Sequence, residues 1–585
     1  GRDHGMRHNF CWSSPAFREK VTAINTRLAE RYGTHPALLM WHVSNEYGGE
    51  GSGAPCYCEL CQAWFRDWLR DRYDNDIETL NHAWWTAFWS SRYESFDQID
   101  APGPLGERAI HGLTLDWKRF NTHQAIDFYR HETSTLKRIT PDVSCTTNFM
   151  WAFEPQDYWQ WANEVDIVSW DGYPGWHCRG DDVREAAGAA FNHDLFRSLK
   201  AGRPFMLMES VPSVTSWFPV CKLKRPGMHK LSSLLAIAHG SDTVQYFQWR
   251  KSRGATEKFF GAVVDHVGHE DTRVFGDIAE LGRVLKKLDG VVGTTVRSEV
   301  AVLFDWPTRW AVSAMSGLGH RHRNYLGTCM QHHAAFWTMG IGVDVIDQTV
   351  ALDEYRLAVL PMLYMLRPDM AEKIERFVAD GGTAVMTYWS GIVDEHDLCH
   401  LGGWPGGGLR KVFGVWDEET DAICEDDVQR LVLSEGNELG LAGEYEILQL
   451  CALIHAEGAT VAGTYGEDFY AGRPALTVNH YGDGKAWYVA ARTGQDFLDD
   501  LYGRLASDLG LRRTLDATLP QGVTARMRTN GETDYVFVMN FTDAVAGVDL
   551  GETTFADVVN GGEVAGRLAL PAYGVAILSR PAVEA

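Results

Sequence analysis

The chain of 585 residues carries a formal net charge of −24, and hydrophobic residues make up 45% of it. A chain of this length is expected to form two to four domains, and its composition is typical of a folded protein. The acidic balance argues against a nucleic-acid partner, which needs a clustered basic face. No apolar run approaches the roughly eighteen residues that a membrane span needs.

The first half of the chain predicts a parallel barrel. From about residue 15 to residue 290, helical patterns alternate with short apolar runs, which is typical of βα units. We expect strands at 37–45, 143–149, 166–171, 204–209 and 243–249. We expect helices between them, including 15–33, 115–139, 185–200 and 270–289. Because five strands cannot close a barrel and the chain opens in a polar stretch, residues 1–292 predict a (β/α)₈ TIM barrel that lacks its first strands.

Two further domains are expected after the barrel. Strand-like runs at 299–304 and 357–362 begin a second alternating region, with a helix near 370–380 and strands near 383–387 and 486–490. We assign residues 293–517 to an α/β, flavodoxin-like domain. Residues 518–585 contain short alternating strands separated by Gly and Asn-Gly turns, which predicts a small C-terminal antiparallel β-sandwich domain.

Two glutamates follow apolar strands of the predicted barrel. Glu46 comes after LLMWHVSN and Glu209 ends PFMLME, and the carboxyl ends of barrel strands converge over one pocket. Burying a carboxylate there costs free energy unless the group is paired or has a function. The alternative to a catalytic role is therefore a structural ion pair with a neighbouring arginine. Two facing carboxylates would separate in proton affinity and supply one acid and one nucleophile, as retaining glycoside hydrolysis requires.

The segments around these glutamates resemble a known family. WHVSNEYG and FMLMES, together with SSPAFREK, CYCELCQAWF, LNHAWWTAFWSSRY, SWDGYP and LFDW in this order, are similar to segments of glycoside hydrolase family 42, whose members are mostly β-galactosidases. The resemblance covers the whole chain. It implies that Glu46 is the general acid/base after strand four and Glu209 the nucleophile after strand seven, so the missing strands would lie upstream of Gly1.

The resemblance also implies a set of substrate-binding residues. Asn45 would hold the sugar 2-hydroxyl, Tyr173 would contact the nucleophile region, Trp89 and Trp217 would line the sugar subsite, and Glu257 would bind the far hydroxyls. Two of these have simpler explanations. Trp89 lies in an aromatic-rich run and could belong to the core, and Glu257 could pair with Arg250 or Arg253.

Phe260 departs from the family pattern. Galactosidases of the family usually have histidine three residues after the glutamate that corresponds to Glu257, whereas a phenyl ring neither donates nor accepts a hydrogen bond. The far end of the subsite should therefore be more apolar. A β-D-galactoside is the preferred substrate, and an α-L-arabinopyranoside, which lacks the hydroxymethyl group, is the alternative.

Four of the eleven cysteines form a cluster in the sequence. Cys56, Cys58 and Cys61 are closely spaced and Cys11 lies upstream; four thiolates suit a closed tetrahedral zinc site. The resemblance supports a structural zinc. Two disulfides, or reduced thiols without metal, are the alternatives. No organic cofactor is expected, and the seven scattered cysteines favour a reducing, cytoplasmic compartment, although any signal peptide would lie upstream of Gly1.

The resemblance implies a homotrimer assembled partly through the second domain. The alternative from another functional class is a non-catalytic protein, in which a truncated barrel is retained together with this second domain. Hydrolysis of a chromogenic β-galactoside distinguishes the two.

Overall fold

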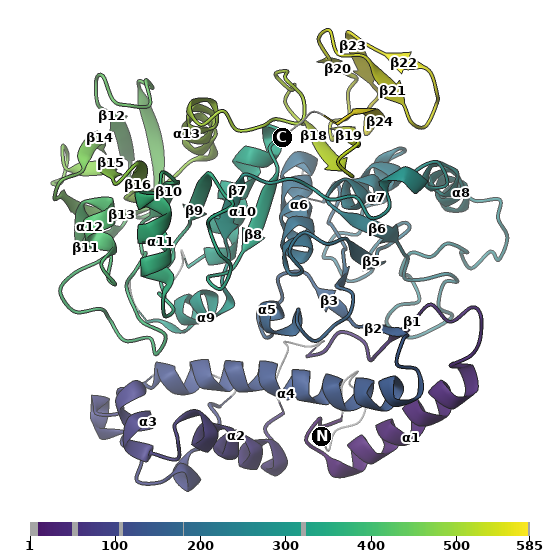
Figure 1. The fold of residues 1–585 in the computed structure, drawn as a ribbon, viewed down its shortest axis with the longest axis horizontal. Coiled ribbons are helices and arrows are strands. Elements are labelled where there is room, and N and C mark those ends of the chain that lie inside the picture. The colour runs from purple at the N-terminus through teal and green to yellow at the C-terminus, as the bar shows by residue number, and fades with distance from the viewer. Residues whose placement is uncertain (1–9, 49–55, 104–108, 179–180, 317–322, 583–585) are drawn as a thin grey trace.

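The computed structural model describes residues 10–48, 56–103, 109–178, 181–316 and 323–582 (Figure 1). Within this part of the chain, no helix combines the length and the apolar character that crossing a membrane requires. The described residues form a barrel-like region, an α/β region and a small β region.

The barrel-like region contains a series of short parallel strands. These are β1 (Met40–His42), β2 (Ser144–Thr146), β3 (Asn148–Met150), β4 (Ser169–Asp171), β5 (Phe205–Glu209) and β6 (Ser241–Val244). β1 pairs with β2, and β3, β4, β5 and β6 pair in that order, all parallel. The five predicted strands are confirmed, the second of them split into β2 and β3 at Thr147. Most of the observed strands are shorter than the predicted runs; β1, for example, covers only Met40–His42 of the run 37–45.

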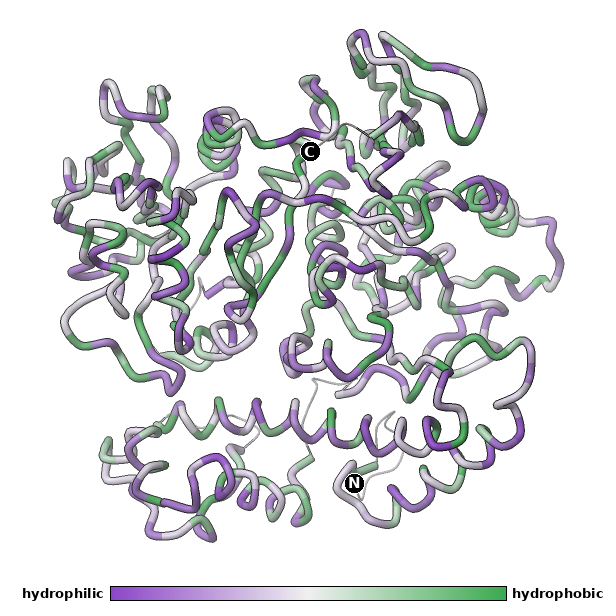
Figure 2. The backbone as a smooth tube through the Cα atoms, viewed as in Figure 1, coloured by the Kyte–Doolittle hydropathy of each residue, from purple (hydrophilic) through white to green (hydrophobic). Residues whose placement is uncertain are grey.

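Helices surround these strands. They are α1 (Pro15–Tyr32), α2 (Glu59–Arg72), α3 (Ile77–Ala83), α4 (His111–Ile139), α5 (Tyr158–Trp161), α6 (Asp182–Ser198), α7 (Met228–Ala238) and α8 (Arg273–Leu285), with 3₁₀ turns η1 (Phe88–Ser90), η2 (Phe96–Gln98) and η3 (Asp289–Val291). Ser14 caps α1 by accepting from the Phe17 N–H, with Pro15 at the first helical position, a favourable start signal. The 29-residue helix α4 lies beneath the strands in Figure 1, and polar and apolar residues alternate along it in Figure 2.

The second region is a doubly wound sheet. Its parallel strands are β7 (Val300–Leu303), β8 (Val343–Ile346), β9 (Leu357–Leu360), β10 (Thr383–Thr387) and β16 (Gly484–Val489). Their spatial order β8-β7-β9-β10-β16 is the flavodoxin-like order, as predicted. β7 and β9 are buried along their whole length, as expected when helices cover both faces. The helices are α9 (Trp306–Ala314), α10 (Tyr325–Thr338), α11 (Met370–Ala379), α12 (Leu409–Phe413) and α13 (Gln495–Asp508).

An antiparallel extension continues this sheet and was not anticipated from the sequence. It consists of β11 (Val415–Ala422), β12 (Gln429–Leu433), β13 (Glu444–Ala456), β14 (Thr460–Tyr465), β15 (Pro474–Tyr481) and β17 (Ala491–Thr493). β15 pairs antiparallel with β16, so the extension shares hydrogen bonds with the parallel strands.

The C-terminal region is antiparallel, as predicted. One sheet has the order β18 (Val523–Thr529), β19 (Thr533–Asn540), β24 (Val575–Pro581), β21 (Phe555–Asp557) and β22 (Glu563–Val564), and a second pairs β20 (Ala546–Asp549) with β23 (Arg567–Leu570).

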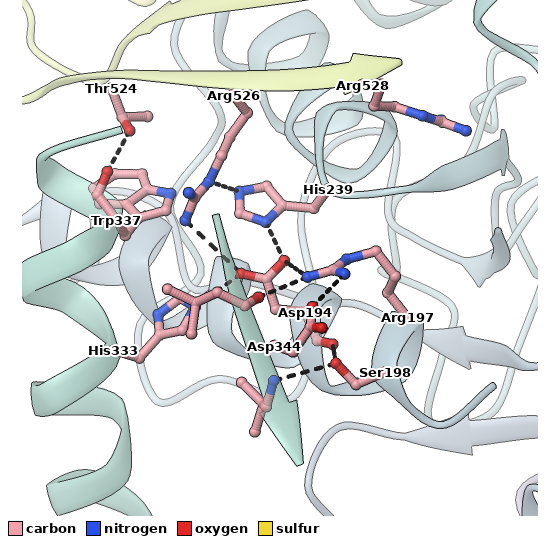
Figure 3. A network of polar contacts seen from close by, with 12 residues as sticks. Asp194, Arg197, Ser198, His239, His333, Trp337, Asp344, Thr524, Arg526 and Arg528 are labelled. Atoms are coloured by element: carbon pink, nitrogen blue, oxygen red, sulfur yellow. Dashed lines mark hydrogen bonds and ion pairs between the residues drawn. The ribbon is translucent and has the colours of Figure 1, made fainter. Parts of the chain in front are cut away.

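A buried carboxylate joins the three regions (Figure 3). Asp194 of α6 accepts hydrogen bonds from Arg197 (3.0 Å), His239 (2.8 Å) and His333 of α10 (2.8 Å), and Arg526 of β18 lies 3.8 Å away. Burial alone would raise the pKa of Asp194, but His239, Arg197 and His333 outweigh it and hold that pKa well below its usual range. Burial lowers the pKa of His239 to about 4, so His239 donates as a neutral imidazole, and Arg197 supplies the positive charge.

Candidate active site

The two predicted glutamates lie at the same edge of the parallel strands. Glu209 is the last residue of β5, and Glu46 follows β1. The structure brings their carboxylates together with a third, from Asp171 at the end of β4, and one oxygen of each lies within 4.8 Å of the others. Retaining glycosidases hold their two carboxyl groups about 5–5.5 Å apart, whereas inverting enzymes need about 6.5–9.5 Å. The spacing therefore suits retention.

Glu46 occupies a strained turn. Its φ is 47° and that of Ser44 is 50°, a left-handed conformation that costs a non-glycine residue about 1 kcal/mol or more and is frequent at functional sites. The Glu46 N–H donates to Oδ1 of Asn148 over 3.1 Å. This bond fixes the turn against β3, and so directs the Glu46 side chain.

Asn148 of β3 connects the site. Its Oδ1 also accepts from His42 Nε2 at 2.9 Å. Its amide nitrogen faces three acceptors, which are Asn45 Oδ1 at 2.9 Å, Asp171 Oδ2 at 2.6 Å and Glu209 Oε1 at 3.4 Å. Asn148 was not predicted. It lies within the predicted run 143–149, in which Ser144, Thr146 and Thr147 are also polar, so its polarity did not single it out.

Tyr173 fixes the other oxygen of Glu209. Its hydroxyl donates to Glu209 Oε2 over 2.6 Å, so Tyr173 contacts the residue that is predicted to be the nucleophile. Burial and the neighbouring Glu209 carboxylate raise the pKa of Tyr173, and the phenol therefore keeps its proton. Both oxygens of Glu209 therefore face a hydrogen-bond donor, one from Asn148 and one from Tyr173.

Asp171 is a residue that the sequence analysis missed. It is 2% exposed, and burial together with the carboxylates of Glu209 and Glu46 holds the pKa of Asp171 well above its usual range. At 4.8 Å and an effective dielectric constant of about 20, each pair of full charges would repel by roughly 3.5 kcal/mol. The sequence signal was available in SWDGYP, where Asp171 ends a buried strand as Glu209 does.

An aromatic wall lies beside Glu209. Phe260 is fully buried, its ring stacks on Trp217 at 4.9 Å, and it lies edge-on to Tyr173 at 5.7 Å and Phe247 at 5.3 Å. Gly261 lets this loop approach its neighbour closely, because a Cβ there would lie 2.8 Å from the Val214 nitrogen. Trp217 is 49% exposed, so it can offer a face to a ligand.

Two other predicted subsite residues, Glu257 and Trp89, lie in a loop and in a 3₁₀ turn. Glu257 lies in the loop before Phe260, whose N–H donates to the Glu257 carbonyl over 2.9 Å. In the described part of the chain, no ion pair joins Glu257 to Arg250 or Arg253. Trp89, in η1, stacks on Phe88 at 4.6 Å and is 76% exposed; it is not a core residue, and the ring contacts of the described residues do not connect it to the carboxylates.

The four predicted cysteines form a cluster near the start of α2. Cys11, Cys56, Cys58 and Cys61 bring their sulfurs within 4.8 Å of one another, and Cys11 Sγ lies 3.6 Å from Cys58 and 3.5 Å from Cys61. A disulfide needs about 2.05 Å, whereas sulfurs bound to one tetrahedral zinc at about 2.3 Å lie roughly 3.8 Å apart. The cluster fits a metal ion.

Known proteins resemble this chain over nearly its whole length. The β-galactosidase family model matches residues 1–288, its trimerisation domain residues 298–512 and its C-terminal domain residues 522–580. The chain is 53% identical to β-galactosidase Pbg of Clostridium perfringens over 99% of this chain and 83% of that protein. It is 44% identical to β-galactosidase GanA of Bacillus subtilis over 98% of this chain and 84% of that protein.

Solved structures agree in fold. The β-galactosidase from Rahnella sp. R3 superposes with a TM-score of 0.95 at 50% identity, covering 99% of this chain and 83% of that one. A catalytic mutant of a GH42 β-galactosidase from G. stearothermophilus gives 0.94 at 46% identity, covering 99% and 84%. Together with the three matched domains, these similarities show that the chain belongs to glycoside hydrolase family 42, the β-galactosidase family.

Proposed function

We propose that the chain removes terminal β-D-galactosyl residues by a retaining mechanism, with Glu209 as nucleophile and Glu46 as general acid/base. The observation that carries the proposal is the approach of these two carboxylates to within 4.8 Å at one strand edge. Family membership supports both the reaction class and the retention of configuration.

The hydrogen bonds support this division of roles. Tyr173 and Asn148 donate to Glu209, which favours the anion that a nucleophile must be. Glu209 attacks the anomeric carbon while Glu46 gives its proton to the departing glycosidic oxygen, so one C–O bond forms as another breaks. Glu46 then takes a proton from water, whose oxygen displaces Glu209 with a second inversion.

The other predicted contacts follow from this arrangement. Asn45 would bind the 2-hydroxyl from beside the acid/base, and Trp217 would stack on the sugar ring, which its 49% exposure permits. Glu257 would reach the far hydroxyls from its loop. Trp89 would line the sugar subsite, and its 76% exposed ring is free to face a ligand.

Phe260 bears on specificity. Its buried ring leaves the Trp217 side of the site without a hydrogen-bonding group at this position. We propose that galactosides are the principal substrates, in line with the relatives named β-galactosidases, and that α-L-arabinopyranosides are accepted as well.

Assembly and metal content are also proposals. We infer a structural zinc bound by Cys11, Cys56, Cys58 and Cys61, and a homotrimer that uses residues 293–517, in which a trimerisation-domain model matches. We place domain boundaries near residues 292 and 517. The number of cysteines outside the cluster favours a reducing compartment, the basis for proposing a cytoplasmic protein.

Hydrolysis of nitrophenyl β-D-galactoside tests the proposed function. We expect turnover by the unmodified chain, a loss of about 10⁴-fold or more in Glu209→Ala, and no loss in Glu280→Ala, an exposed helix residue paired with Lys230. Equal rates for the unmodified chain and Glu209→Ala would favour the non-catalytic remnant.

A further inference from the structure

A third carboxyl group in the active site has no part in the two-carboxylate mechanism. Asp171 ends β4, between Asn148 at the start of β3 and Glu209 at the end of β5. It lies within 4.8 Å of both catalytic carboxylates and is 2% exposed. A side chain so placed must either add a charge to the site or carry a proton.

The hydrogen bonds of Asp171 leave one oxygen for a proton. Oδ2 accepts from Asn148 Nδ2 over 2.6 Å. Oδ1 is buried and accepts no hydrogen bond from any of the described residues. Since the Glu46 side chain lies within hydrogen-bonding reach of Asp171, a proton on Oδ1 would have a carboxylate to which it can be donated.

Among the described residues, the groups that act on Asp171 are carboxyl, amide and phenol groups. Those facing it from the adjacent segments are Glu46 after β1, Asn148 on β3, Tyr173 after β4, Glu209 on β5 and the buried Tyr158 on α5. Among the described residues, His42 donates to Asn148, and burial lowers the pKa of His42 although Asn148 and Glu46 act to raise it. Within the described residues, neither arginine nor lysine neutralises this carboxyl group.

We propose that Asp171 is a neutral, proton-bearing positioning residue, which accepts from Asn148 and donates to Glu46 while Glu46 acts as acid and base. The inference rests on the proposed function of Glu46. When Glu46 releases its proton to the leaving oxygen, its new carboxylate gains a stronger hydrogen bond from Asp171. The stabilisation grows in the transition state, which is the condition for an effect on rate. The proton of Asp171 is not transferred.

Replacement by asparagine and by alanine separates this role from a structural one. Asparagine keeps an acceptor for Asn148 and a neutral donor for Glu46, so Asp171→Asn should stay within about tenfold of the parent rate. Asp171→Ala removes the donor and should lower kcat by about 10²–10³-fold. Because a nitrophenolate leaves with little protonation, the loss in Asp171→Ala should be larger for lactose than for nitrophenyl galactoside. A structural defect would lower both rates equally.

The pH profile gives a second signature. If Asp171 is neutral, Asp171→Asn changes no charge and leaves the basic limb of the pH–rate profile in place. Asp171→Ala removes a donor that stabilises the carboxylate formed when the acid gives up its proton, so this limb should move to higher pH. An ionised Asp171 would instead give a shift to lower pH in Asp171→Asn, which would overturn the proposal.

Difference infrared spectroscopy tests the proton without using activity. We expect the carbonyl band of a buried neutral acid at pH 7, lost in Asp171→Asn and kept in Asp277→Asn, a control on α8. Absence of that change, or equal kinetic damage in the asparagine and alanine variants, contradicts the inference. If the unmodified chain hydrolyses no galactoside, the proposed function fails, while the infrared result still decides the protonation of Asp171.

Discussion

Asp171 and Asp194 are both buried, 2% and 1% exposed, yet their surroundings differ in kind. Asp194 receives hydrogen bonds from Arg197 and two histidines, whereas Asp171 faces two other carboxylates and one amide. The pKa of Asp194 is accordingly held well below its usual range, where burial alone would raise it, and the pKa of Asp171 is held well above by burial and like charge.

Asp194 therefore has a structural role, whereas we propose that Asp171 takes part in the reaction. A buried charge matched by an arginine joins three regions of the chain, as Figure 3 shows. A buried cluster of like charges is costly and persists where chemistry needs perturbed acids. The comparison predicts that damage to the first site lowers stability and damage to the second lowers activity.

Asp194→Ala should give the largest loss of stability. It leaves Arg197, whose side chain is 1% exposed, without one of its two carboxylate partners, at a cost of about 3–5 kcal/mol. Denaturant unfolding should show this loss. Asp277→Ala, which breaks a surface pair with Arg273, should cost less than about 1 kcal/mol. Similar unfolding midpoints for Asp194→Ala and Asp277→Ala would show that Asp194 does not have the structural role assigned to it.

Asp417 extends the comparison to a buried carboxyl without catalytic neighbours. Burial raises its pKa from 3.8 to about 7. Between these pH values the folded state holds a proton that the unfolded chain has lost, so stability falls as pH rises through the window, by up to about 4 kcal/mol. Asp417→Asn should therefore raise Tm at pH 8 and leave it nearly unchanged at pH 4. An equal shift at both pH values would show that ionisation of Asp417 is not the cause.

The cysteine cluster should resemble Asp194 in being structural. Cys61→Ser is expected to lower bound zinc from one ion per chain to nearly none, with a fall of a few degrees in Tm, as elemental analysis and calorimetry would measure. Cys329→Ser, which alters a cysteine that is equally buried outside the cluster, should retain the metal. Zinc retained in Cys61→Ser would contradict the assignment.

Phe260→His should give the smallest effect, confined to specificity. A hydrogen-bonding ring in the aromatic wall should raise the ratio of kcat/KM for galactoside over arabinopyranoside by about tenfold, which corresponds to roughly 1.4 kcal/mol. Phe259→His, at a neighbouring ring that is 63% exposed, is the matched control. An unchanged ratio in Phe260→His would remove Phe260 from the specificity argument.

The sequence allowed the barrel strands and both glutamates to be predicted, because buried parallel strands are continuous apolar runs and their ends are informative. Asp171 and Asn148 were not predicted, since their importance depends on which strand ends meet. The bond between Asp194 and His333 joins residues far apart in the chain, and no local pattern signals it. The antiparallel strands β11 to β15 were not predicted, because the sequence of a half-buried strand of mixed polarity resembles that of a loop.

In the proposed mechanism Glu209 bonds to the sugar, whereas Glu46 and Asp171 do not. Treatment with a slowly released 2-fluoro-galactosyl donor, followed by peptide mass spectrometry, tests it most directly. We predict a single galactosyl adduct on Glu209, within residues 205–210, and none in Glu209→Ala. An adduct on Glu46 or Asp171 would contradict the assignment of Glu209 as nucleophile. So would the absence of any adduct in a chain that turns over the donor.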